Sequence, residues 1–239
     1  MNEPANPHQR AFTKQDFDTA VANQLLRYAD FVSRRGYICN TLGNIALRAT
    51  HPYDPKNGVI YTKHKGISLE EMTAENIVVK DIDGKLLYGS RDTSVGNKLN
   101  CEIFKHRSDI NAVIHLHVNE ILSLFSVNRW KDFPYLSIDA PPVLGKNPHI
   151  LDPEVNVEQD ASHIKDFIGK TNCFIMPNHG VTTLGRDISE AYNRMNTVVA
   201  ETRRIANAIL LNTVAGSSVP YLPLSEVEKL YRIADGLTR

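Results

Sequence analysis

The chain has few cysteines and no long apolar segment, so it has neither the disulfide framework of a crosslinked protein nor a membrane-spanning helix in its sequence pattern. Its 239 residues include only three cysteines, an odd number at scattered positions (Cys39, Cys101 and Cys173) and without the close pairs of a zinc knuckle. This usage is typical of reduced core thiols, so we expect a cytoplasmic protein. No apolar run approaches the roughly 20 residues that cross a bilayer. The first residues lack the basic flank and the apolar stretch of a signal peptide.

The chain also carries no net charge. The 27 basic and 27 acidic residues balance to a formal charge of zero, so no overall field would draw the protein to nucleic acid or to an anionic membrane. The length suits one α/β domain with a sizeable core. We expect a flexible N-terminus over residues 1–10 and a single domain over residues 11–239.

Helical patterns open and close the chain, and strand patterns fill its middle. Thr13 with Asp16 predicts the start of a helix that ends near Gly36, and Asp187 with Glu190 predicts the start of the longest helix, which runs to about residue 211. Further helices are expected at 99–104, at 121–125 and from 225, and strands at 45–47, 59–61, 77–79, 86–88, 112–117, 173–176 and 181–183. The chain therefore predicts an α/β fold of the α+β type, with a central sheet flanked by helices.

The most informative motif is His115-Leu116-His117, which follows an apolar strand pattern. Because side chains alternate along a strand, the two imidazoles point to the same face. A third histidine, His179, follows later in Asn178-His179-Gly180. Three imidazole nitrogens hold a divalent metal and leave a position open for substrate or water, so the pattern predicts a catalytic metal site.

Three motifs in this order carry a resemblance. The segments Thr41-Leu42-Gly43-Asn44, 112–117 and 178–180, the last followed by a long helix, resemble the class II aldolase/adducin-head family over about residues 20–211. The resemblance implies a mainly antiparallel sheet covered by helices and a homotetramer with sites at subunit boundaries. It implies that His115, His117 and His179 bind one divalent metal per subunit, most often zinc, with manganese, iron or cobalt in some relatives.

The chain departs from the family where an acidic residue normally touches the metal and moves protons. Gly96 stands at that position, and Asn100 stands where a histidine is usual. Glu102 is the nearest acid downstream, and Glu120 comes shortly after His117, so these two are the candidate catalytic residues. The family's proton-donating tyrosine has no clear match, although Tyr135, Tyr221 and Tyr231 are available.

The resemblance also implies an anion pocket formed by three loops. The candidate residues for binding substrate are Thr41, Gly43, Asn44, Lys65, Gly66 and Ser94. Glycine lets the backbone approach an anion closely. The pocket would suit a small anionic substrate carrying a phosphate or a second carboxylate.

These features favour a metal-dependent carbon–carbon lyase. Because Gly96 removes the usual base, we expect decarboxylation of a hydroxylated aromatic or heteroaromatic acid through a metal-stabilised enolate. Three alternatives stay open: an aldolase that cleaves a sugar phosphate or a related hydroxy-carbonyl compound, a non-haem iron oxygenase acting on an aromatic acid, and a non-catalytic adducin-like binding module.

Overall fold

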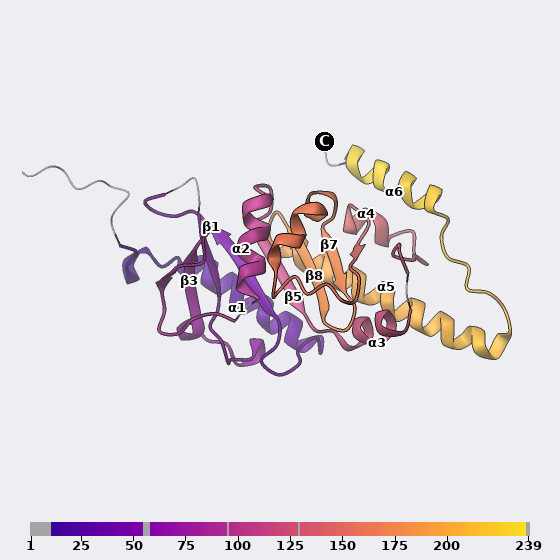
Figure 1. Ribbon diagram of the computed structural model, residues 1–239, viewed down its shortest axis with the longest axis horizontal. Helices are drawn as coiled ribbons and strands as arrows, with labels where there is room; N and C mark the ends of the chain where they lie inside the picture. The colour runs from indigo at the N-terminus through magenta and orange to yellow at the C-terminus, as the bar shows by residue number, and fades with distance from the viewer. Residues whose placement is uncertain (1–10, 55–57, 95, 129, 238–239) are drawn as a thin grey trace, which may run out of the picture.

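An eight-stranded sheet runs through the middle of the molecule (Figure 1). The computed structural model describes residues 11–54, 58–94, 96–128 and 130–237, so the N-terminus expected to be flexible lies outside the described residues. The strand order is β4-β3-β2-β1-β5-β8-β7-β6. The strands are β1 (Asn44–Ala49), β2 (Val59–Lys63), β3 (Ile77–Asp81), β4 (Leu86–Tyr88), β5 (Ala112–Leu116), β6 (His149–Ile150), β7 (Cys173–Met176) and β8 (Gly180–Gly185).

The sheet is antiparallel except where β6 runs parallel to β7. The predicted class, a mainly antiparallel sheet flanked by helices, is therefore confirmed. Long-range pairing sets the centre of the sheet: β1 lies against β5 with Asn44 opposite His115, and β5 lies against β8 with His115 opposite Thr182. These three neighbouring strands position the candidate site.

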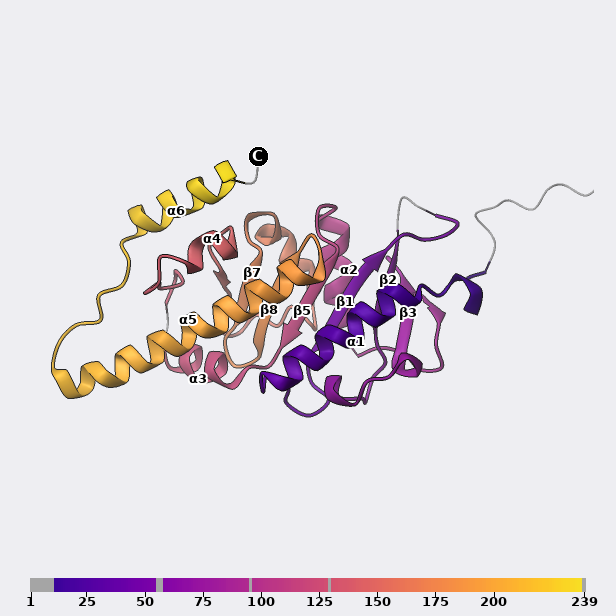
Figure 2. The same cartoon turned by 180° about the vertical axis from the view of Figure 1, so that it is seen from behind.

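Helices cover both faces of the sheet. The long helices α1 (Thr19–Arg34) and α5 (Ile188–Ala215) lie across one face (Figure 2), and α2 (Asn97–His106) lies on the other (Figure 1). The remaining helices are α3 (Asn119–Val127), α4 (Ala140–Leu144) and α6 (Leu224–Leu237). Ile114 packs in the core under α1 and α5, whereas Val113 packs in the core under α2. His115 shares the α2 face with Val113, because residues two apart in a strand point the same way.

The ends of several elements differ from the predicted ones. Thr13 forms a capping box with Asp16 around a 3-10 helix (Lys14–Asp16), and Asp18 then caps α1 by accepting from two backbone N–H groups. The single predicted helix is thus two, because the chain offers two capping side chains in succession. Helix α5 continues to Ala215, where Gly216 ends it with φ of 67°. Residues 181–183 do not extend the preceding strand but form a hairpin with it.

Two further expectations concerned buried free thiols and the lack of a membrane-spanning segment. Cys101 and Cys173 are buried free thiols as expected, whereas Cys39 is exposed, because it lies in the connection between α1 and β1 rather than in an element of the core. Among the described residues, no helix combines the length and the apolar character needed to cross a membrane.

Candidate metal centre

The central strand β5 carries the first histidine, and the second directly follows its end. His115 is 1% exposed and lies between Asn44 of β1 and Thr182 of β8. His117 follows the end of the strand on the same face, and the Nε2 atoms of the two rings are 3.1 Å apart. Since backbone pairing on both sides holds β5, these imidazoles are fixed before any ligand arrives.

The tight turn between β7 and β8 supplies the third histidine. Asn178 adopts a left-handed backbone conformation with φ of 67°, which asparagine tolerates better than most residues. The His179 N–H donates to the Met176 carbonyl at 3.0 Å and closes the turn. The ligating atoms of the three histidines all lie within 4.8 Å of one another. The structure therefore brings together the three residues predicted as metal ligands.

Burial keeps two of these imidazoles neutral. Desolvation lowers the pKa of His115 to about 3, and desolvation together with the nearby His179 lowers that of His117 to about 4. The Nδ1 atom of His115 lies 3.0 Å from the Thr182 hydroxyl oxygen. With Nδ1–H donating to Thr182, the Nε2 lone pair of His115 faces the other two histidines and is free to bind a cation.

A carboxylate that the sequence reasoning missed completes the cluster. Glu158, in the loop after β6, places Oε2 3.1 Å from His179 Nε2 and Oε1 3.6 Å from His115 Nε2. Burial alone would raise the pKa of Glu158, but its contacts with the histidines lower it to about 2, so the group is ionised at neutral pH. The signal for Glu158 in the sequence was only indirect. With glycine at position 96, any carboxylate at the metal centre must come from another part of the chain.

The donor set fits a divalent metal. Neighbouring donors bound at about 2.1 Å from one ion lie roughly 3.0–3.5 Å apart. The Nε2 atoms of His115 and His117 are 3.1 Å apart, Glu158 approaches His179 to 3.1 Å and His115 to 3.6 Å, and the three histidine donors all lie within 4.8 Å of one another. These donors are close enough to share one ion. Three imidazole nitrogens and a carboxylate oxygen suit zinc, iron or manganese. The same set discriminates poorly among these metals.

The three loops predicted to bind an anion are tied together by hydrogen bonds. The buried Lys63 ammonium donates to the Thr41 carbonyl at 2.6 Å and to the Ile67 carbonyl at 2.7 Å. The Lys65 N–H donates to the Asp92 carbonyl at 2.8 Å. Burial lowers the pKa of Lys63 to about 8. The three predicted segments therefore adjoin one another: Thr41 and Gly43 with Asn44 at the start of β1, Lys65 with Gly66, and Ser94.

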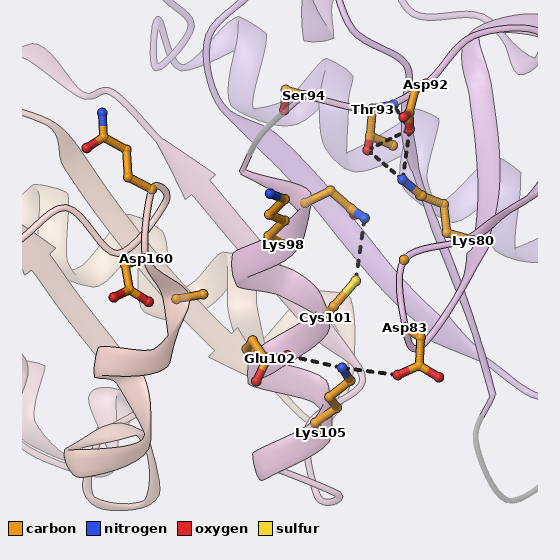
Figure 3. Close-up of a pocket in the computed structure, with 14 residues that line it drawn as sticks. Lys80, Asp83, Asp92, Thr93, Ser94, Lys98, Cys101, Glu102, Lys105 and Asp160 are labelled. Carbon is orange, nitrogen blue, oxygen red and sulfur yellow. Dashed lines mark hydrogen bonds and ion pairs between the residues drawn. The ribbon is translucent and has the colours of Figure 1, made fainter.

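The two candidate catalytic glutamates engage other partners. Glu102 lies on α2, contacts Lys105 at 3.1 Å and lines a cavity of about 620 Å³ together with Ser94 and Lys98 (Figure 3). Glu120 lies in the first turn of α3 and forms an ion pair of 2.6 Å with Arg203 of α5. Neither carboxylate belongs to the histidine cluster in the described part of the chain.

The candidate tyrosines are also placed. The Tyr135 hydroxyl is 2.7 Å from that of Tyr231 on α6. Burial raises the pKa of both groups, so each remains a phenol. Tyr221 packs at the edge of the core near Trp130. We assign none of the three to the metal centre.

Comparison with known proteins identifies the family. The model for the "Class II Aldolase and Adducin N-terminal domain" matches residues 23–203. The chain belongs to this family. It is 28% identical over 178 residues to an L-fuculose phosphate aldolase of Methanococcus maripaludis, an alignment that covers 74% of this chain and 91% of the relative.

Other members of the family catalyse related reactions or share the fold. The chain is 25% identical over 219 residues to a 3-oxo-tetronate 4-phosphate decarboxylase of Haemophilus influenzae, covering 89% of this chain and 97% of that protein. A solved L-fuculose 1-phosphate aldolase superposes with a TM-score of 0.73 at 20% identity, covering 95% and 100% of the two chains. The named relatives are lyases, in agreement with the expected metal-dependent carbon–carbon lyase.

Proposed function

We propose that the protein is a divalent-metal-dependent lyase that breaks a carbon–carbon bond in a small anionic substrate. The observation that carries the proposal is the cluster of His115, His117 and His179 on paired central strands, with an ionised carboxylate beside it. A metal bound to the three histidines would supply a Lewis acid that stabilises the enolate left by bond cleavage. Zinc is the first metal to test, followed by manganese, iron and cobalt.

The protein's own residues would orient and hold the reactants. Thr182 fixes the ring of His115 through Nδ1, which directs Nε2 into the site. The loops bearing Thr41, Lys65 and Ser94 would hold the anionic end of the substrate through backbone N–H groups and hydroxyls. Lys63 adds a buried positive charge beneath these loops.

Two reactions fit this site. Decarboxylation of a hydroxylated acid, aromatic or heteroaromatic, needs the electron sink and a later proton, and the decarboxylase among the relatives supports this reaction. Aldol cleavage of a sugar phosphate also needs a base, and Glu158 supports it as the second candidate. The absence of an acid at position 96 favoured decarboxylation in the sequence, but with Glu158 beside the histidines it no longer separates the two reactions.

The first experiment is elemental analysis of the purified protein beside His117→Ala. We expect near-stoichiometric zinc or manganese that the variant lacks. The loaded protein would then be assayed for carbon dioxide release from hydroxylated acids and for a ketose- or aldehyde-type product from sugar phosphates. Iron together with oxygen consumption would favour an oxygenase, and no metal after reconstitution would refute the lyase and leave a binding module.

The proposal includes a cytoplasmic homotetramer. Helix α5 projects past the sheet, and both views show its C-terminal end away from the strands (Figures 1 and 2). That end exposes Leu210, Leu211 and Val214, at 64%, 69% and 89%. Apolar side chains grouped at a projecting helix end suit a contact between copies of the chain.

A further inference from the structure

The start of α2 has no room for a side chain at position 96. A Cβ atom built on Gly96 would overlap Oε1 of Glu158, and it would lie 3.2 Å from Cδ of Glu158 and 3.2 Å from Nδ2 of Asn44. Real Cβ atoms essentially never come as close to another atom as this Cβ would come to Oε1, and the carboxylate is held beside His179 and His115. Position 96 and position 158 therefore share one space, which Glu158 fills.

The loop that carries Glu158 is held in place by the two residues that precede it, Asn156 and Val157. Val157 is completely buried in the core under α2. The Asn156 side-chain oxygen accepts from the N–H groups of Glu158 and Gln159 at 3.1 and 3.3 Å. This turn directs the Glu158 side chain towards the histidines, and the side chain is 21% exposed.

In the described part of the chain, the carboxylate of Glu158 lies within ion-pair distance of two imidazoles, those of His179 and His115. Asn44 and Asn100 are neutral, and they bond to each other at 2.8 Å through the Asn100 amide. The carboxylate oxygens and the imidazole nitrogens can all donate to a cation, and the spacing of these donors points to a cation between Glu158 and the histidines.

We propose that Glu158 is the carboxylate of this metal centre, supplied by the loop after β6 in the space that Gly96 leaves at the start of α2. One carboxylate oxygen binds the metal beside the three imidazoles, and the other faces the substrate position. The inference rests on the proposed function, because it requires the histidines to bind a metal. It also predicts that the carboxylate can be moved from position 158 to position 96.

The first test measures metal affinity by chelator competition in the full-length protein. Glu158→Gln keeps the shape of the side chain but removes its charge, and we expect at least a tenfold weaker affinity for zinc. Glu154→Gln, in the same loop with an exposed side chain, is the matched control and should bind as the wild type. The visible spectrum of cobalt(II)-loaded protein should change in the first variant only.

The second test moves the carboxylate. Gly96→Glu alone should lower the melting temperature, because two side chains then compete for one space. Gly96→Glu combined with Glu158→Ala should recover stability and bind zinc more tightly than Glu158→Ala alone. Wild-type affinity in Glu158→Gln, or no gain in the combined variant, would overturn the inference. A wild-type protein that binds no metal would instead refute the proposed function.

Discussion

Gly180 tests whether close strand packing sets the geometry of the metal centre. A Cβ atom at this position would lie 2.5 Å from the Leu116 carbonyl oxygen and 3.2 Å from Cε1 of His115. The carbonyl belongs to β5, which is paired on both sides, so it cannot move aside cheaply. Gly180→Ala should therefore push β8 away from β5 and shift His179 relative to His115.

The expected loss of stability follows from overpacking a filled site. Inserting one methyl group into well-packed structure costs about 1–3 kcal/mol. For a domain of this size each kcal/mol lowers the melting temperature by about 2–4 °C, so we expect a fall of roughly 2–12 °C. Zinc affinity should weaken by about 10–100-fold, as when the groups that orient metal ligands are changed.

A matched glycine provides the control. A Cβ atom at Gly169 would meet nothing within 4 Å, so Gly169→Ala should leave the melting temperature within about 2 °C of the wild type and the zinc affinity unchanged. Differential scanning fluorimetry and chelator competition measure both properties. An alanine at position 180 that melts and binds zinc like the wild type would refute the reasoning.

Three further predictions concern other parts of the molecule. Arg107 is buried and donates to the Ile168 and Thr171 carbonyls and to the Asn172 side chain. Arg107→Met should therefore lower the free energy of unfolding, measured by urea denaturation, by about 3–5 kcal/mol. A loss below about 1 kcal/mol would contradict this role. The metal-free protein should lose stability as the pH falls from about 6.5 towards 4, because unfolded histidines bind protons that the folded pair, with pKa values of about 3 and 4, does not. Urea denaturation at pH 7 and pH 5 measures this, and replacing both histidines by glutamine should flatten the slope. Leu211→Asp with Val214→Asp should give a folded protein of lower oligomeric state by light scattering; an unchanged mass would show that the α5 end contacts no second copy.

Local patterns predicted most elements, because their signals lie within a few residues. Asp187 with Glu190 predicted the start of α5, where the Asp187 side chain accepts from the Glu190 N–H. The alternation in His115-Leu116-His117 placed two imidazoles on one face. The pairing of β1 with β5 and of β5 with β8 has no local signal, so the resemblance gave only a mainly antiparallel sheet and the strand order came from the structure.

Glu158, which the sequence analysis missed, shows which kind of contact the sequence alone does not predict. Glu158 reaches the histidines from a loop that lies far from both histidine motifs in the chain. Glu102 was preferred because it is close to Gly96 in sequence, yet its helix turns it towards Lys105. Proximity along the chain predicts contact within an element, whereas only the three-dimensional fold shows which loop fills a space.

Because His179 lies in the turn between β7 and β8, the metal centre can form only after most of the chain has been made. A chain made only as far as His117 holds two of the three histidines and no complete donor set. The cluster exists only after the β7–β8 hairpin has formed and docked along β5, one of the longest-range pairings in the sheet. Tight metal binding would therefore report that folding of the centre is complete, and the bound ion would in turn hold β5 to that hairpin.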